Sequence, residues 1–325
     1  MSTVIHAKNL SKIYRKRSGS LWQQLFRPVW QESRAVSNIS LEIVAGESVA
    51  FLGPNGAGKT TTTKMLTGLV YPSQGSARVL GYTPFERHRD FLCSIGLVMG
   101  NKAGLNWDLS ARQSFSLNKQ MYSIKDRDFQ DRVERYSQLL NVTNRLDAQV
   151  RRLSLGERMK LELIGAMLHA PKILFLDEPT IGLDIESKQA LRGFLKQLHK
   201  DEGVTLLLTS HDMDDVEAVC ERVVVINHGS IIYDGHMREL ITRYRDERFV
   251  RLQLASLAPS ATMEQFGQVI EANHEATQYL MSIKRADLPK ALAEISSKLD
   301  IVDITIEATP LEYIIGDLYS GHVEK

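Results

Sequence analysis

The stretch Phe51-Leu52-Gly53-Pro54-Asn55-Gly56-Ala57-Gly58-Lys59-Thr60-Thr61-Thr62 decides the fold of this chain. Gly53, Gly58 and the pair Lys59-Thr60 match the pattern G-x-x-x-x-G-K-[ST], in which glycines let backbone N–H groups curl around phosphate oxygens without Cβ clashes. Lys59 supplies a mobile positive charge for terminal phosphates, and the Thr60 hydroxyl is placed to ligate Mg²⁺. The stretch therefore predicts a phosphate-binding loop.

The sequence on both sides supports this interpretation. Residues 48–52 form an apolar, strand-like run that enters the loop, and residues 60–69 can leave it as a helix. The N-terminus of such a helix would face a bound anion, because its first backbone N–H groups have no partner within the helix. The alternative is a glycine turn that contains a lysine by chance, and a strand before it with a helix after it argues against that.

Length, charge and cysteines limit the classes of protein that fit. The 325 residues suffice for one large domain and a smaller one. Lys and Arg number 40 against 39 Asp and Glu, so no overall field attracts nucleic acid, and we expect no nucleic-acid partner. The two cysteines, Cys93 and Cys220, lack metal-ligand spacing, which favours a reducing compartment.

Apolar runs limit how the chain can meet a membrane. No run approaches the roughly 18 residues that span a bilayer, and the N-terminus lacks the features of a signal peptide. We therefore expect a soluble protein with no transmembrane segment of its own, whose membrane role would need a partner.

Two further apolar runs end in residues that carry chemistry. Residues 173–176 deliver Asp177 and Glu178, and residues 204–208 are followed by His211. Ligands bind at the carboxyl ends of parallel strands, and a buried carboxylate without a partner is costly, so a purely structural role is disfavoured. The pattern predicts an α/β fold with these side chains at the edge of a parallel sheet.

Two other features admit a structural and a functional interpretation. Tyr14 follows a predicted strand at 4–10 and can either stack on a purine base or belong to the core. Leu153-Ser154-Leu155-Gly156-Glu157 begins a helix predicted to run to about 169, and a capping box alone would explain Ser154 and Glu157.

The region 15–34 has an unusual apolar stripe between basic residues. Pro28 interrupts it, so we expect a short amphipathic helix that ends near Arg27. It would rest on a membrane surface or membrane partner, or else pack on its own domain. The apolar members of the stripe are Leu21, Trp22, Leu25, Phe26, Val29 and Trp30.

Together, the motifs resemble in kind and order those of the nucleotide-binding subunits of ATP-binding-cassette (ABC) transporters, over about residues 3–238. The resemblance implies an α/β ABC-type P-loop ATPase domain at 3–240, with an inserted helical subdomain at about 101–165. A small C-terminal α+β accessory or regulatory domain would occupy 241–325. The implied ligands are ATP and Mg²⁺.

The resemblance also implies a role for each matching residue. Glu178 would be the general base that polarises the attacking water, His211 would contact the γ-phosphate, and Lys59 would act on the same phosphates. Asp184 would belong to a loop that links the sites of paired subunits. Mg²⁺ would be held by Thr60, by Asp177 through water, and by Asn101. The ATP-binding residues would be Tyr14, Gly53, Pro54, Asn55, Gly56, Ala57, Gly58, Lys59, Thr60 and Thr61.

Two departures from the family pattern stand out. The signature motif, usually Leu-Ser-Gly-Gly-Gln, faces the ATP of the other subunit and corresponds here to Ser154, Leu155, Gly156 and Glu157, with leucine and glutamate as departures. We expect Glu157 to turn back toward its own backbone. Asn101 stands where the family usually has a glutamine, and its side chain is shorter by one methylene, so we expect a bridging water.

The segment 100–110, with Trp107-Asp108-Leu109, is similar to exporter ATPases near the drug- and antibiotic-resistance group. This similarity implies export through separate integral-membrane permease subunits, by a homodimer or heterodimer of ATP-binding subunits. The chain would then lie in the cytoplasm, peripheral on the cytoplasmic face of the membrane. The rival interpretations are a soluble ABC ATPase that acts on ribosomes or DNA, and a hydrolysis-poor partner in a heterodimer, suggested by Asn101 and Glu157.

The tail alternates between strand and helix patterns. Residues 249–255, 278–284 and 301–307 are predicted strands, and 263–270, 288–299 and 311–319 are predicted helices. No phosphate, metal or nucleophile motif occurs in it, so a structural accessory and a ligand sensor both remain open.

Overall fold

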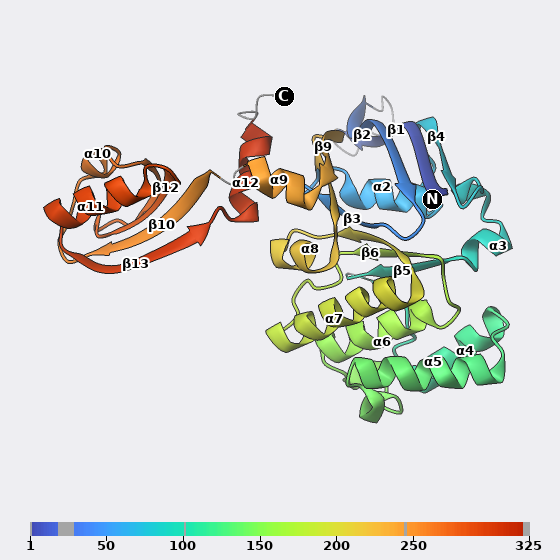
Figure 1. Cartoon of the computed structure of the whole chain (residues 1–325). Coiled ribbons are helices and arrows are strands. Elements are labelled where there is room, and N and C mark those ends of the chain that lie inside the picture. The colour runs from blue at the N-terminus through green and yellow to red at the C-terminus, as the bar shows by residue number, and fades with distance from the viewer. Residues whose placement is uncertain (1, 19–28, 101, 244–245, 321–325) are drawn as a thin grey trace. The chain divides into compact units, whose positions relative to one another are not determined.

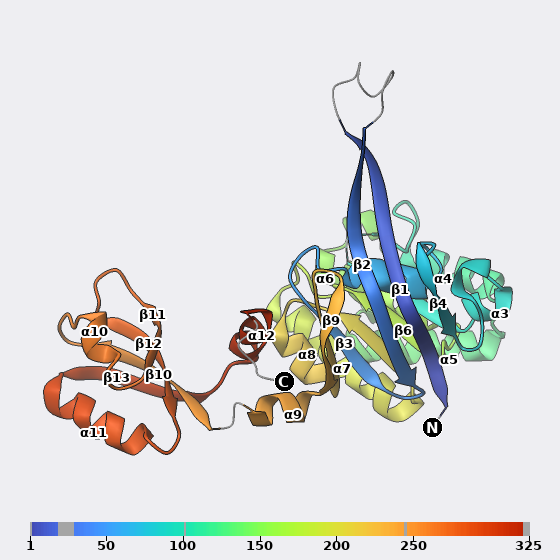
Figure 2. The same ribbon diagram turned by 90° about the horizontal axis from the view of Figure 1, so that it is seen from above.

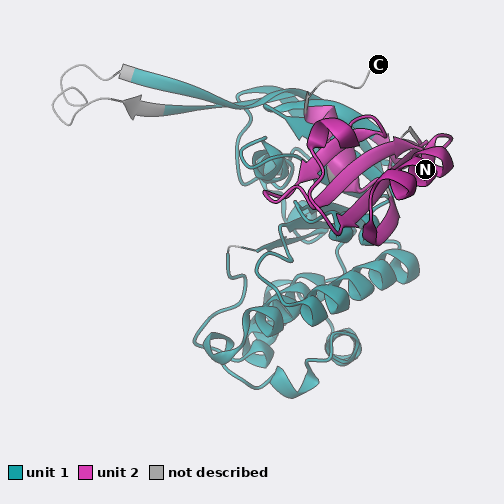
Figure 3. Cartoon of the chain, turned by 90° about the vertical axis from the view of Figure 1, so that its left-hand side faces the viewer, with its two compact units in different colours: residues 1–234 teal, residues 235–325 magenta. Residues whose placement is uncertain are grey.

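The computed structural model describes residues 2–18, 29–100, 102–243 and 246–320. The chain divides into two compact units, residues 1–234 and 235–325 (Figure 3). Among the helices of the described ranges, none has the length and apolar character that crossing a bilayer requires.

A six-stranded sheet forms the centre of the first unit. Its order is β5-β6-β7-β3-β8-β9, and the neighbours from β5 to β8 run parallel. Every residue of β3, β6 and β7 is buried, as expected for strands covered on both faces. The bounds are β3 Ser48–Leu52, β5 Ile95–Met99, β6 Ile173–Asp177, β7 Thr205–Thr209, β8 Arg222–Asn227 and β9 Ser230–His236.

A second, antiparallel sheet of order β2-β1-β4 covers helix α2 (Lys59–Leu66), which packs between the two sheets (Figure 1). The strands are β1 Thr3–Ser18, β2 Val29–Val44 and β4 Gln74–Val79. Pairing of β1 with β4 ends at Ser11, whereas pairing with β2 continues to Ser18. The outer part is therefore a two-stranded ribbon, which projects from the unit in Figure 2.

The structure has strands on both sides of the helix predicted to end near Arg27. Residues 19–28, on which the expected helix falls, lie outside the described residues, but Val29 and Trp30 belong to β2 and pair with Ser18 and Arg17. Spacing at four residues indicated a helix, yet β-branched and aromatic residues also suit a strand that has a partner.

Helices α4, α5, α6 and α7 lie on the side of the six-stranded sheet away from α2 (Figure 1). Helices α4 and α5 pack on α6, and α6 contacts both β5 and α7. The bounds are α3 Arg89–Leu92, α4 Ala111–Met121, α5 Asp126–Leu139, α6 Leu155–Met167, α7 Ile185–Glu202 and α8 Met213–Val219, with 3₁₀ turns at Pro84–Glu86, Thr143–Arg145 and Val150–Arg152.

The second unit has the chain order β-α-β-β-α-β and an antiparallel sheet of order β11-β12-β10-β13, the ferredoxin-like arrangement. Its separate core includes Val250, Leu252, Met281 and Ile295. The predicted helix at 263–270 was wrong, because α10 ends at Met263 and β11 begins at Gln268. The bounds are α9 Met237–Arg243, β10 Glu247–Leu254, α10 Ser260–Met263, β11 Gln268–Ala272, β12 Gln278–Lys284, α11 Leu288–Lys298, β13 Ile301–Ala308 and α12 Leu311–Ser320.

Candidate active site

The loop between β3 and α2 has the close backbone packing that its glycines predict. A Cβ on Gly53 would lie 2.2 Å from the Ile226 carbonyl oxygen, and a Cβ on Gly58 would lie 2.5 Å from that of Ala35. Gly58 also has a φ of 111° at the N-cap of α2, a conformation that favours glycine. Larger residues at either position would push the loop out of place.

Lys59 and Thr60 begin α2 and make different contacts. The Lys59 Nζ donates to the Gly53 carbonyl oxygen at 2.6 Å. Burial lowers the pKa of Lys59, although Glu178 and Asp177 attract its charge. The Thr60 Oγ1 donates to Oδ1 of Asp177 at 2.8 Å, so a hydroxyl and a carboxylate meet at the carboxyl end of β6.

Glu178 has a backbone conformation that is uncommon for a residue other than glycine. Its φ is 54°, and its N–H donates to the Thr209 carbonyl oxygen at 3.0 Å. Its Oε2 lies 2.6 Å from Nδ1 of His211. The carboxylate is thus held at the end of one strand against an imidazole that follows the next.

These residues surround one pocket of about 390 Å³. The pocket combines the loop, a carboxylate, an ammonium group and an imidazole from three separate stretches of sequence. Its lining residues are Ala35, Asn55, Gly56, Ala57, Gly58, Lys59, Thr60, Thr61, Glu178, Ile181 and His211.

Thr60, which lines the pocket, and Asp177, which is bonded to Thr60 but does not line the pocket, suit a hard divalent ion. The Thr60 hydroxyl and the Asp177 carboxylate supply two adjacent oxygen ligands of the kind Mg²⁺ prefers. The described residues contain no group of three His, Cys, Asp or Glu able to hold a metal, so such an ion would need further oxygens from a nucleotide or water. Asn101, the third expected ligand, lies outside the described residues.

The residues of the signature stretch cap helix α6. Oγ of Ser154 accepts from the Glu157 N–H at 3.2 Å, and Oε2 of Glu157 accepts from the Ser154 N–H at 2.9 Å. The expected turn of Glu157 toward its own backbone is confirmed. Its Oε1 lies 2.6 Å from Nε of Arg145, and the hydrogen bond from Ser154 lowers the pKa of Glu157.

Helix α6 meets α7 at this end. Asp184 is the N-cap of α7 and accepts from the Ser187 N–H at 2.8 Å and from its Oγ at 2.9 Å. A Cβ on Gly156 would lie 2.2 Å from that Oγ. Neither the signature residues nor Asp184 lines the 390 Å³ pocket, so the structure separates them from the phosphate-binding loop.

Tyr14 is 41% exposed, so the alternative that it belongs to the core is wrong. It lies on β1, with Nζ of Lys12 5.2 Å from its ring centroid. The ring is therefore free of the core, and it does not line the pocket of the phosphate-binding loop.

Sequence reasoning missed the residues that support the carboxylates. Thr209 Oγ1 donates to Oδ1 of Asp177 at 2.6 Å. Arg192 of α7 donates to buried Asp215 at 2.6 Å, and Lys188 forms an ion pair with Asp212 that raises the pKa of Lys188, so these pairs tie α7 to the start of α8 just after His211. Two basic residues four apart, facing acids after the next strand, were the available signal.

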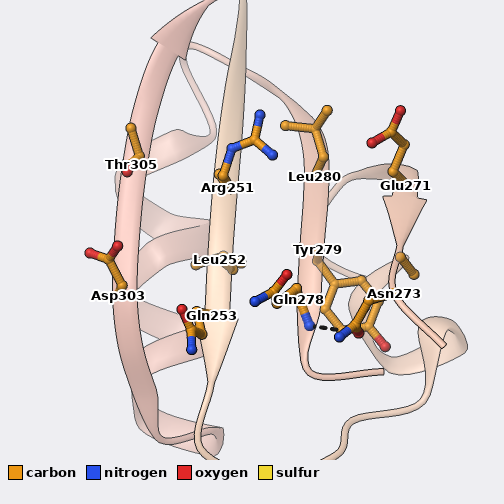
Figure 4. A pocket seen from close by; sticks show the side chains of 11 residues that line it. Arg251, Leu252, Gln253, Glu271, Asn273, Gln278, Tyr279, Leu280, Asp303 and Thr305 are labelled. Carbon is orange, nitrogen blue, oxygen red and sulfur yellow. Dashed lines mark hydrogen bonds between the residues drawn. The ribbon is translucent and has the colours of Figure 1, made fainter. Parts of the chain in front are cut away.

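A hollow of about 280 Å³ lies on the sheet of the second unit (Figure 4). Arg251, Gln253, Gln278 and Asp303 are among its lining residues, and none of the predicted site residues is.

Comparison with known proteins identifies the first unit. The family model described as "ABC transporter" matches residues 36–181. The ABC transporter ATP-binding protein NatA of Bacillus subtilis (strain 168) is 36% identical over 214 residues, which cover 66% of this chain and 87% of that protein. This chain belongs to the ATP-binding subunits of ABC transporters. The resemblance and the fold class predicted from the sequence are confirmed.

Further relatives agree with this family. The bacitracin transport ATP-binding protein BcrA of Bacillus licheniformis is 30% identical over 255 residues, 78% of this chain and 76% of that protein. A dimeric ATP-binding cassette solved with ADP and Pi shares the fold, with a TM-score of 0.61 and 22% identity over 72% of this chain and 99% of that one. The chain is an ATP-binding ATPase subunit, and such subunits work with membrane permease components.

The second unit has its own match. The family model described as "EvrA-like ABC transporter, C-terminal domain" covers residues 246–307, which span β10 to β13. The second unit therefore contains a segment similar to a C-terminal domain described for ABC transporters.

Proposed function

We propose that this ABC subunit hydrolyses ATP to drive export of a substrate through separate integral-membrane permease subunits. The observation that carries the catalytic part is the Glu178 carboxylate, held 2.6 Å from His211 in the pocket that also contains Lys59. Export is supported by the segment at Trp107 and by relatives such as the bacitracin transport protein.

The loop 53–61 would bind the phosphates of ATP through backbone N–H groups and the Lys59 ammonium. That ammonium donates to the Gly53 carbonyl oxygen at 2.6 Å, which keeps its buried charge partnered. Tyr14, exposed on the ribbon, would stack on the adenine.

Thr60 and Asp177 would hold Mg²⁺, whose charge would offset that of the phosphates. Glu178 would accept a proton from the attacking water and orient it in line with the γ-phosphate. His211 would fix the Glu178 carboxylate through the 2.6 Å contact and reach the γ-phosphate. Thr209 would keep the Asp177 carboxylate in place.

A second ATP-binding subunit, identical or different, would complete each site. Ser154, Leu155, Gly156 and Glu157 would face the ATP of the other subunit, with Asp184 linking the two sites. Because Glu157 is paired with Arg145 at 2.6 Å, its negative charge is compensated near that phosphate. This pairing weakens one of the two reasons for regarding the chain as a hydrolysis-poor partner.

The two parts of the chain would have separate tasks. Residues 3–240 would form the ATP-binding domain with its helical subdomain at about 101–165, and residues 241–325 the accessory domain. The chain would lie peripherally on the cytoplasmic face of the membrane, held by its permease.

The test is purification of the tagged chain from detergent-solubilised membranes of its native host, followed by measurement of phosphate release. We expect a multi-span membrane protein to copurify and phosphate release to require Mg²⁺ and ATP. Copurification with ribosomes or DNA and no membrane protein would overturn the transport part. A folded complex that releases no phosphate would overturn the catalytic part.

A further inference from the structure

Asp215 carries a buried carboxylate beside the candidate active site but outside its pocket. The residue lies in α8, is 1% exposed and does not line the 390 Å³ pocket. A carboxylate at that depth is costly unless other groups compensate its charge and accept its offer of hydrogen bonds. The groups that do so here come from three separate stretches of the chain.

The two oxygens of Asp215 contact different partners. Oδ1 accepts from Nε of Arg192 in α7 at 2.6 Å. Oδ2 accepts from the hydroxyl of Thr180 and, at 3.3 Å, from the hydroxyl of Ser210. Thr180 and Ser210 are 4% and 0% exposed, so little water reaches either bond. The carboxylate therefore joins α7, the turn after β6 and the segment that follows β7.

The two hydroxyl donors flank the residues to which the proposed function assigns the chemistry. Thr180 follows Glu178 by two positions, and Ser210 directly precedes His211. Each hydroxyl thus holds the backbone beside one partner of the 2.6 Å contact between the Glu178 carboxylate and the His211 imidazole. Because both hydroxyls donate to a single oxygen, Asp215 also holds the two backbone segments relative to each other.

The imidazole of His211 depends on such support, because its side chain is 57% exposed and packing alone does not hold it. The residue on its other side is held as well. Asp212 accepts from Lys188 and, at 3.3 Å, from Arg192. The Asp212 N–H also donates to Oγ of Ser210 at 3.0 Å, which closes a short loop around His211. His211 therefore lies between two residues that are both tied to neighbouring elements.

Stability alone would not require a carboxylate at position 215. Replacing a buried ion pair by apolar residues of similar volume is often neutral or stabilising, because the attraction only partly repays the cost of removing two charges from water. An apolar side chain cannot accept hydrogen bonds from two hydroxyls and a guanidinium at defined positions. The contacts of Asp215 therefore favour a role in placing its neighbours.

We propose that Asp215 is a positioning residue for ATP hydrolysis, whose carboxylate keeps Glu178 and His211 in contact through Thr180 and Ser210. This inference rests on the proposed function, because it takes Glu178 as the general base. Asp215 does not line the pocket, so it would act through these neighbours alone. Loss of the bridge should slow the chemical step and leave ATP binding unchanged, because the phosphate-binding loop is not part of it.

Substitution of the two hydroxyls tests the bridge while Asp215 keeps its ion pair with Arg192. Thr180→Val and Ser210→Ala should each lower kcat of the full chain by about 10- to 100-fold, the effect of a small misplacement of a catalytic group. KM for ATP should stay within about twofold of the wild-type value. Thr180→Ser keeps the donor and should restore most of the rate. Asp215→Asn exchanges one acceptor oxygen for an amide donor and should lose rate as the hydroxyl variants do.

Two matched controls report the general effect of losing a polar group. Ser137→Ala removes a hydroxyl that is also 0% exposed but lies in α5, where it donates to the Glu134 carbonyl oxygen. Asp214→Asn neutralises a neighbouring carboxylate whose side chain is 78% exposed and lies 3.7 Å from Arg192. Both controls should hydrolyse ATP at the wild-type rate.

The Glu178→Gln background separates positioning from a general loss of structure. The base is already absent there, so moving it should cost nothing further. Adding Thr180→Val or Ser210→Ala should leave the residual single-turnover rate, measured with the protein in excess over ATP, within about twofold. A loss by the same factor in both backgrounds would overturn the proposal, because the hydroxyls would then act independently of Glu178.

Thermal unfolding and binding of a fluorescent ATP analogue show whether each variant is folded and loads nucleotide. Ser210→Ala removes a single oxygen atom, so it decides the question even where Thr180→Val unfolds. Wild-type rates in both folded hydroxyl variants would refute the role of Asp215 and leave the proposed function intact. A folded wild-type chain that releases no phosphate would instead refute the proposed function, and this inference with it.

Discussion

At the scale of single residues, the most informative position is Glu178, whose left-handed backbone aims a carboxylate at His211. Such a conformation costs on the order of 1–3 kcal/mol in a residue other than glycine, so the surrounding structure must impose it. The hydrogen bonds from the Glu178 N–H to the carbonyl oxygen and Oγ1 of Thr209 hold the backbone in this conformation. The expected benefit is a carboxylate positioned for proton transfer.

Glu178→Gln should bind ATP as the wild type does and hydrolyse it about 100-fold more slowly or worse, because the amide cannot accept a proton. Phosphate release and binding of a fluorescent ATP analogue measure the two effects. The control is Glu221→Gln, an exposed carboxylate at the end of the segment before β8. Hydrolysis at the wild-type rate in Glu178→Gln would remove Glu178 from the role of base.

At the scale of elements, the start of α6 carries a charge whose effect depends on pH. The hydrogen bond from the Ser154 N–H holds the pKa of Glu157 below its ordinary value of 4.5. The ionised carboxylate therefore stabilises the fold above about pH 4.5, and this contribution is lost as pH falls through the lowered pKa.

Glu157→Gln should lower stability at pH 7 by about 0.3–1 kcal/mol, the usual effect of a carboxylate at a helix N-terminus. The difference from wild type should shrink as pH is lowered below 4.5, where wild-type Glu157 also becomes neutral. Thermal unfolding of both proteins between pH 3 and 7 checks this. A difference that stays constant over that range would mean that the charge of Glu157 contributes nothing.

The contact between α6 and α7 depends on the absence of a side chain at Gly156. Gly156→Ala should force the helices apart, since its Cβ would lie 2.2 Å from Oγ of Ser187 and 2.9 Å from its Cβ. We expect a loss of about 1–3 kcal/mol, the range for overpacking. Adding Ser187→Gly should recover part of it by removing both atoms. A double-mutant cycle from thermal unfolding measures the coupling, and strictly additive effects would contradict the contact.

The individual strands also show how much of the fold could be predicted from the sequence alone. Strands β3, β6 and β7 were predictable, because short and fully apolar runs are typical of parallel strands that are buried on both faces. The outer part of β1 and the start of β2 were not, because Val29 and Trp30 are stabilised by a partner strand that spacing does not reveal. Strand β11 was missed for a similar reason, since its residues alternate weakly and, within the described part of the chain, pair with β12 alone.

The residues of the candidate site likewise divide into those that the sequence predicts and those that it does not. Lys59, Thr60, Asp177, Glu178 and His211 sit in short motifs, and the fold brings them together as expected. The support that Thr209 gives to Asp177 could not be predicted, because it is a contact between distant parts of the chain. The same holds for the ion pair of Arg145 with Glu157 in the signature stretch.

At the scale of the whole molecule, the described residues include one hydrophobic cluster that lies between Ile5 and Ile226 and another that lies between Val250 and Ile295, and the two share no residue. The first lies within residues 1–234, which contain the pocket lined by Lys59, Glu178 and His211, and the second lies within residues 235–325. A hydrophobic cluster within each unit favours two unfolding transitions, because chains of more than one domain commonly depart from a single cooperative transition.

ATP with Mg²⁺ should therefore raise the temperature of one unfolding transition and leave that of the other unchanged. At 100 times its dissociation constant, ATP would add about 2.7 kcal/mol to the unit that binds it. Ile295→Ala, which empties a fully buried position in the second core, should lower only the other transition, by about 2–5 kcal/mol. Calorimetry of wild type, Ile295→Ala and Lys59→Ala, each with and without ATP, separates the effects. Lys59→Ala should lose the ATP-induced shift and keep both transitions. ATP could instead raise the transition temperature that Ile295→Ala lowers. ATP would then stabilise the second core, and the separate tasks proposed for the two units would be wrong.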